Sequence, residues 1–123
     1  MVCFQAAGTS YCLPLDATRA VRKADELVAL PDPARDVVGI IPGDPPLTVI
    51  SPLRARAGHI LVLDTGDREF GLLVDVVTGL ERFDAHDIRI APEGQGRPLI
   101  SGTLEVDGRL IFLADPTELA GRL

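Results

Sequence analysis

The segment from Gly71 to Leu80, GLLVDVVTGL, constrains the fold more than any other part of this sequence. It is an apolar run with a single acid, Asp75, and it follows a second apolar segment, HILVLD, across a turn at Gly66 and Asp67. Two short apolar segments joined by a glycine-containing turn are typical of a β-hairpin. A strand this apolar either has both faces covered or exposes one face for binding, and the sequence leaves both possibilities open.

The same pattern of short apolar segments and turns extends along the chain, which indicates an all-β barrel or sandwich. The Asp107-Gly108 pair predicts a type I′ hairpin turn, because both central residues of that turn need positive φ. A short C-terminal helix is expected, with Asp115 as its cap, Pro116 in its first turn and Glu118 completing a capping box. The expected strands lie at Val2–Ala7, from Tyr11, at Leu47–Ile50, Ile60–Leu63, Phe70–Val77, Ile88–Pro92 and Leu99–Gly102, and in the LIFLAD segment from Leu110.

Length, charge and hydropathy exclude several classes of partner. The chain has 123 residues, enough for one domain with its own core. Its net charge of −6 opposes nucleic acid and anionic membranes, because binding to a polyanion depends on clustered Lys and Arg. No apolar run approaches the roughly 18 residues that span a bilayer, and the N-terminus lacks the pattern of a signal peptide. We therefore expect a cytoplasmic protein that does not insert into membranes.

The residues that most often carry chemistry point away from catalysis. A two-residue turn at Gly8 and Thr9 would place Cys12 opposite Gln5, too far from Cys3 for an easy disulfide, so two inert free thiols are expected. No GxSxG-type nucleophile motif is present. We expect no catalytic residue, no cofactor and no metal, and a small-ligand enzyme is the least favoured of the possible functions.

Two sites that contain acidic residues can each be interpreted either as a binding site or as a purely structural feature. His86 lies between Asp84 and Asp87, but three such groups so close in sequence rarely converge on a metal, and a solvated loop is favoured. Asp75 either contacts a partner or accepts backbone N–H groups, and the second interpretation is favoured because a carboxylate in an apolar strand needs hydrogen bonds.

Taken in order, several segments resemble the CheW-like coupling domain family of bacterial chemotaxis. They are Phe4, Tyr11 to Leu15, the TRAV segment from Thr18, Leu30-Pro31, Val38 to Ile41, the GLLVDVV run and the C-terminal hairpin. The resemblance implies two intertwined small SH3-like β-barrels, with subdomains of roughly 1–15 with 83–123 and 16–82. It also implies a strand from Thr18 to Val21, although the composition from Asp16 to Leu30 favours a helix. A single helical turn is expected at Ala34 to Val38.

The resemblance further implies a function and a set of contacts. Family members are non-enzymatic adaptors that couple a chemoreceptor's cytoplasmic tip to a CheA-like histidine kinase, and the matching contact positions here are Thr18, Val21, Asp44, Val77 and Leu80. The chain departs from the family at Pro42 to Pro45, where Asp44 stands in a region that usually carries an arginine. The alternative is therefore a repurposed CheW-like binding module with a different partner outside chemotaxis.

Overall fold

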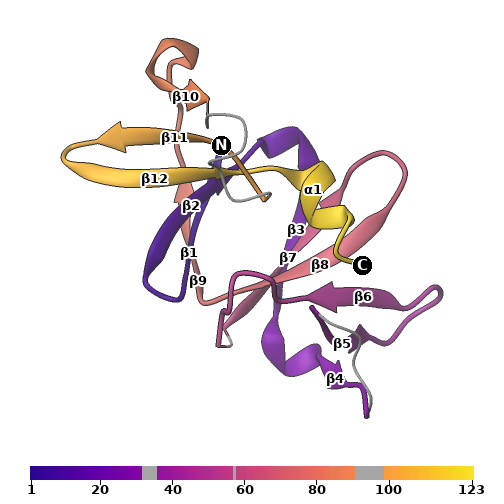
Figure 1. Ribbon diagram of the computed structural model, residues 1–123. Coiled ribbons are helices and arrows are strands. Elements are labelled where there is room, and N and C mark those ends of the chain that lie inside the picture. Colours follow the sequence, from indigo (N-terminus) through magenta and orange to yellow (C-terminus); the bar gives the residue numbers. More distant parts are fainter. Residues whose placement is uncertain (32–35, 57, 91–98) are drawn as a thin grey trace.

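The computed structural model describes residues 1–31, 36–56, 58–90 and 99–123, and in these residues the strands form two six-stranded mixed sheets (Figure 1). The first sheet has the order β10-β11-β12-β2-β1-β9 and the second the order β3-β7-β8-β6-β5-β4. The strands of the first sheet are β1 (Val2–Ala6), β2 (Thr9–Leu13), β9 (Val76–Leu80), β10 (Arg89–Ile90), β11 (Ile100–Val106) and β12 (Arg109–Ala114). Those of the second are β3 (Thr18–Lys23), β4 (Val28–Ala29), β5 (Val37–Ile41), β6 (Leu47–Ile50), β7 (His59–Asp64) and β8 (Glu69–Val74).

The β1–β2 hairpin turns one residue earlier than predicted. Its central residues are Ala7 and Gly8, both with positive φ, in place of Gly8 and Thr9. Alanine is an unusual residue for this backbone conformation, but its N–H donates to a carboxylate oxygen of Asp75 at 2.8 Å, a contact from a distant part of the chain that holds the turn. The earlier turn places Cys3 directly opposite Cys12, so the predicted pairing of Cys12 with Gln5 is wrong.

The segment after Asp16 forms a strand, as the resemblance implied. β3 pairs antiparallel with β7 from Thr18 to Lys23, and short 3₁₀ turns flank it at Leu15–Ala17 and Ala24–Glu26. Its helix-favouring composition is overridden because pairing with β7 satisfies the backbone within a sheet. The helical turn predicted at Ala34 to Val38 is wrong at Val37 and Val38, which belong to β5, and its first two residues lie outside the described part of the chain.

The apolar run that contains Asp75 is two strands in two sheets. β8 ends at Val74 and pairs with β7, whereas β9 begins at Val76 and pairs with β1. The single strand predicted from Phe70 to Val77 is therefore divided at Asp75. Every residue of β8 after Glu69 is buried, while β9 alternates between exposed and half-buried residues. β8 therefore has both faces covered, whereas β9 has an exposed face, and its use in binding stays a prediction.

The C-terminal hairpin and helix follow the prediction with one difference. Asp107 and Gly108 both have positive φ, and the Asp115 carboxylate accepts the N–H groups of Thr117 and Glu118 at the start of α1 (Pro116–Ala120). In the predicted capping box, the Glu118 side chain would accept the N–H of Asp115. That N–H instead donates to the Leu99 carbonyl at 2.9 Å. Leu119 on this helix is fully buried. Leu123 lies beyond the helix and is 37% exposed.

Among the residues that the structure describes, three clusters of buried side chains form the core. The largest joins both sheets, with Phe4 and Tyr11 from the first, Phe70 and Leu72 from the second, and Leu119 from the helix. A second cluster lies on the other face of the first sheet, and a third belongs to the second sheet. Sheet membership places β9 with β1, although the predicted division assigned residues 76–80 to the 16–82 part. That division into subdomains stays a prediction.

Candidate protein-interaction surface

β3 forms one edge of the second sheet and carries two of the predicted contact residues. Thr18, at its start, is half-buried, and its hydroxyl donates to the carbonyl of Pro14 at 3.2 Å. Val21, paired with Leu61 of β7, has 48% of its surface exposed. An aliphatic side chain that far exposed on an edge strand is available to a partner, whereas the Thr18 hydroxyl is already engaged within the chain.

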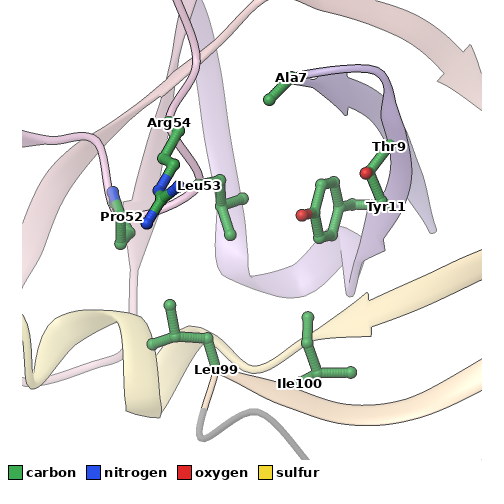
Figure 2. A pocket seen from close by; sticks show the side chains of 8 residues that line it. All are labelled: Ala7, Thr9, Tyr11, Pro52, Leu53, Arg54, Leu99 and Ile100. Atoms are coloured by element: carbon green, nitrogen blue, oxygen red, sulfur yellow. The ribbon is translucent and has the colours of Figure 1, made fainter.

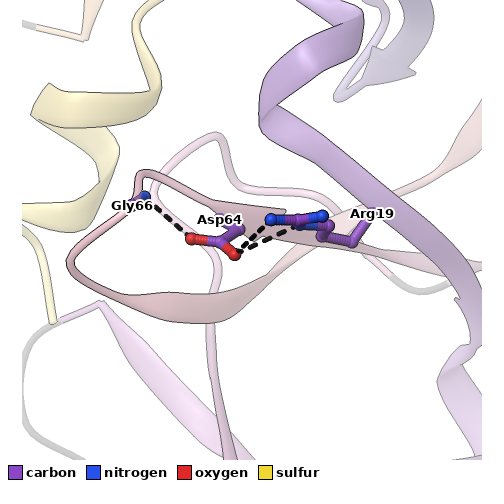
Figure 3. A network of polar contacts seen from close by, with 3 residues as sticks. All are labelled: Arg19, Asp64 and Gly66. Carbon is purple, nitrogen blue, oxygen red and sulfur yellow. Dashed lines mark hydrogen bonds and ion pairs between the residues drawn. The ribbon is translucent and has the colours of Figure 1, made fainter.

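The guanidinium of Arg19, on the same strand, is held by Asp64 of β7 (Figure 3). The Nε and Nη2 groups of Arg19 both donate to one carboxylate oxygen of Asp64, at 3.1 and 2.9 Å, while the other oxygen accepts the N–H of Gly66 at 2.8 Å. The Gly66 hydrogen bond, followed by the Arg19 contact, holds the pKa of the Asp64 carboxyl below its ordinary value. Arg19 remains largely exposed, so this edge carries an ion-paired guanidinium on the same strand as Val21.

β9 forms an edge of the first sheet, and its two predicted contact residues face different surroundings. Val77 is half-buried and packs against the central core cluster, whereas Leu80 is 68% exposed. Val76, which was not among the predicted contacts, is exposed as well. Alternation along the strand would have indicated Val76, but only once the strand was known to begin after Asp75. The exposed apolar surface of β9 is therefore formed by Val76 and Leu80.

Asp44 is exposed in the loop between β5 and β6, and its peptide bond with Pro45 is cis. The predicted contacts therefore occupy three segments: β3, β9 and this loop. Strand pairing joins β3 to β7 and β9 to β1, so among the described residues it connects none of the three segments to another. Thr18 and Val21 share β3, and Val77 and Leu80 share β9, but within each strand the two side chains have different surroundings.

A cavity of about 510 Å³ lies where the two sheets meet (Figure 2). One side comes from the β1–β2 hairpin, with Tyr11, and the other from the segment after β6, with Leu53 and Arg54. The ring of Tyr11 stacks on that of Phe4, with ring centroids 5.4 Å apart. The remaining lining residues are Ala7, Thr9, Pro52, Leu99 and Ile100. Sequence reasoning missed this cavity because its walls come from three segments far apart in the chain.

The His86 cluster, which was considered as a metal site, forms a capped turn. Asp84 accepts the N–H of His86 at 3.0 Å and caps the short 3₁₀ turn at Ala85–Asp87, as expected of a solvated loop. Within the described ranges, no three His, Cys, Asp or Glu side chains are grouped so that they could hold a metal ion. In that same part of the chain, no helix is long and apolar enough to cross a bilayer.

Comparison with known proteins places this architecture. Over 93% of its length the chain matches the crystal structure of the scaffolding protein TtCheW from Thermoanaerobacter tengcongensis, at a TM-score of 0.79 and 21% sequence identity, and the match covers 86% of that chain. The fold is therefore all-β, with two intertwined small SH3-like barrels and a short C-terminal helix. The family model for the CheW-like domain matches residues 45–123, and the chain belongs to that family. A search of the curated proteins found no match.

Proposed function

We propose that this protein is a non-enzymatic cytoplasmic scaffold that couples a chemoreceptor's cytoplasmic tip to a CheA-like histidine kinase. Membership of the CheW-like domain family is the observation that carries the proposal. A scaffold of this kind acts by holding two partners in register, so that a change in one alters the other through interface free energies of a few kcal/mol. It needs partner-facing surfaces and no reactive group.

Two edge strands offer such surfaces. Val21 on β3 and Leu80 on β9 are exposed aliphatic side chains on different sheets, so two partners could bind at the same time. Apolar side chains that become buried at an interface contribute strongly to affinity, whereas charges at the rim mainly set the association rate. We therefore assign the binding energy to these two edges and a steering role to Arg19, which lies on the same strand as Val21.

The test measures binding of the purified full chain to a CheA-like kinase regulatory domain and to a receptor tip, both taken from the same cell, by titration calorimetry. Val21→Asp and Leu80→Asp should each weaken binding of one partner by tenfold or more, since a charge would replace a buried aliphatic group. The matched controls are Val28→Asp and Leu110→Asp, which alter residues of comparable exposure, 50% and 54%, on other strands. Absence of binding to both partners would contradict the proposal.

Asp44 favours the alternative, a CheW-like module that binds a different partner outside chemotaxis. An exposed anion in a loop where the family usually carries a cation repels a partner carboxylate that would have paired with that cation. Asp44→Arg should therefore strengthen kinase binding if the loop faces the kinase. Unchanged affinity would remove this loop from the interface, and recovery of neither a kinase nor a receptor with the native protein would favour the alternative.

A further inference from the structure

The β1–β2 hairpin places the two cysteines of the chain face to face. Cys3 pairs directly with Cys12, and the same register pairs Ala6 with Thr9 across the Ala7-Gly8 turn. Hydrogen-bonded and non-hydrogen-bonded pairs alternate away from a two-residue turn. Since the pair next to the turn is hydrogen-bonded, the third pair beyond it, Cys3 with Cys12, is non-hydrogen-bonded, the type in which side chains approach most closely.

The side chains of both cysteines also point into the same space. Cys3 and Cys12 belong to one buried cluster on the face of the first sheet opposite the central core, together with Leu104 and Ile111. Both are free thiols, and burial, followed by the proximity of Cys3, raises the pKa of Cys12. A non-hydrogen-bonded antiparallel pair has its Cα atoms about 4.5 Å apart, inside the range of roughly 4.4–6.8 Å that a disulfide needs.

We propose that Cys3 and Cys12 form a redox-sensitive dithiol, which a small peroxide converts into an intramolecular disulfide. The Cys3 sulfur attacks one oxygen of hydrogen peroxide, the O–O bond breaks, and the departing hydroxide takes the thiol proton and leaves as water. The Cys12 sulfur then attacks the resulting sulfenic acid at Cys3, the S–O bond breaks, and a second water leaves with the Cys12 proton. Two thiols are oxidised, and one peroxide is reduced to two waters.

The surroundings assign the first step to Cys3. Cys3 retains slight exposure, and it lines a hollow of about 80 Å³ together with Glu81 and Arg109, whereas Cys12 is fully buried. Burial raises the pKa of both thiols, that of Cys12 to about 12. At Cys3 the Glu81 carboxylate adds to the rise, and the N-terminal amine and Arg109 partly offset it. The thiolate is the reactive form, so the reaction is slow and begins at Cys3.

The test uses the full reduced chain. After treatment with hydrogen peroxide, the protein is denatured, labelled with N-ethylmaleimide and weighed by mass spectrometry. The proposal predicts a monomer that has lost two hydrogen atoms and carries no label, and that accepts two labels after reduction. Two labels after treatment, oxygen adducts without a disulfide, or disulfide-linked dimers would overturn it.

An equilibrium measurement removes the dependence on rate. The chain is refolded from urea in mixtures of reduced and oxidised dithiothreitol, and the disulfide fraction is compared with that in urea. In the folded chain the two cysteines are already paired, whereas the unfolded chain must close the loop between them. The ratio of disulfide to dithiol should therefore be roughly a hundredfold higher in the folded chain than in urea. By linkage, the disulfide should raise the folding equilibrium constant by the same factor. An equal disulfide fraction in the folded and unfolded chain would overturn the proposal.

A matched variant tests the register itself. In Cys3→Ser/Gln5→Cys, the thiol introduced at the exposed position 5 is a diagonal neighbour of Cys12, roughly 7–8 Å away. It should close with Cys12 at least tenfold less favourably than Cys3 does, although the spacing along the chain is shorter. Equal closure of the two pairs would show that chain proximity, and not the hairpin register, governs the reaction.

Discussion

Asp75 fastens three segments at the point where the chain passes from one sheet to the other. One carboxylate oxygen accepts the N–H of Ala7 in the β1–β2 turn at 2.8 Å, and the other accepts the N–H of Arg56, ahead of β7, at 2.7 Å. Its own N–H donates to the Gln5 carbonyl at 2.9 Å. The structural interpretation of this acid, an acceptor of backbone N–H groups, is therefore confirmed.

Replacing that carboxylate tests its importance for stability. Asp75→Asn keeps the size of the side chain but turns one acceptor into a donor that faces a backbone N–H. We expect the free energy of unfolding to fall by about 1–3 kcal/mol, measured by urea denaturation. Asp67→Asn is the control, since it makes the same change in the exposed β7–β8 turn and should have little effect. Equal midpoints for the two variants would contradict the assigned role.

Asp64 predicts a dependence of stability on pH. In the folded protein the pKa of the Asp64 carboxyl lies below its ordinary value. The ionised carboxylate therefore stabilises the fold at pH values above the pKa of the unfolded chain, and this stabilisation is lost as the pH falls through the pKa of the folded protein. The urea midpoints of the wild type and of Asp64→Asn should therefore differ at neutral pH and converge below about pH 4. A difference that does not change with pH would show that the charge of Asp64 is unimportant.

The break between β8 and β9 depends on a close backbone approach. A Cβ at Gly58 would overlap the backbone carbonyl of Asp75, and its neighbour along the chain begins β7. The atoms that a Cβ at Gly58 would meet belong to the backbone of Asp75, so no flexible side chain could move to make room. Gly58→Ala should therefore destabilise the fold by about 2 kcal/mol or more in urea denaturation.

Gly121→Ala is the matched change, because Gly121 follows α1 with φ −66° and ψ −9°, a conformation that alanine adopts readily. We expect its midpoint to remain close to that of the wild type. If Gly58→Ala were equally mild, the two segments would be able to separate, and the crossing between the sheets would not depend on their contact.

Elements whose geometry is set by neighbouring residues were predictable. The Asp107-Gly108 turn and the strand at Leu47–Ile50 occur as the local sequence indicated. The β1–β2 turn was displaced because a carboxylate from Asp75 binds the N–H of Ala7, and no local rule contains that contact. A strand from Thr18 to Val21 was predicted only through the family resemblance, since the local composition favours a helix, and the observed strand extends to Lys23.

The two sheets share their largest core cluster, so we expect the molecule to unfold as one unit. Leu119 of α1 is fully buried in this cluster with residues from both sheets. Leu119→Ala should cost about 2–5 kcal/mol and lower the stability of both sheets together. Fluorescence of Tyr11, the single tyrosine of a chain without tryptophan, reports the first sheet, and amide exchange in β7 and β8 reports the second.

Coincident transitions in the two measurements would support a single cooperative unit. Protected amides in β7 and β8 after the tyrosine signal has changed would show that the second sheet is stable alone, and that the shared cluster does not bind the sheets into one unit.

The amino-acid sequence by itself determined the all-β class and the main turns, because turn chemistry and apolar alternation act between residues close in the chain. The order of its segments also carried the resemblance to the family. The tertiary structure alone decided three further features. It divided the apolar run at Asp75, set the hairpin register that brings Cys3 to Cys12, and placed Val21 and Leu80 on the edges of different sheets. Each depends on contacts between segments distant in the chain, whose geometry is fixed only when both sheets pack around one core.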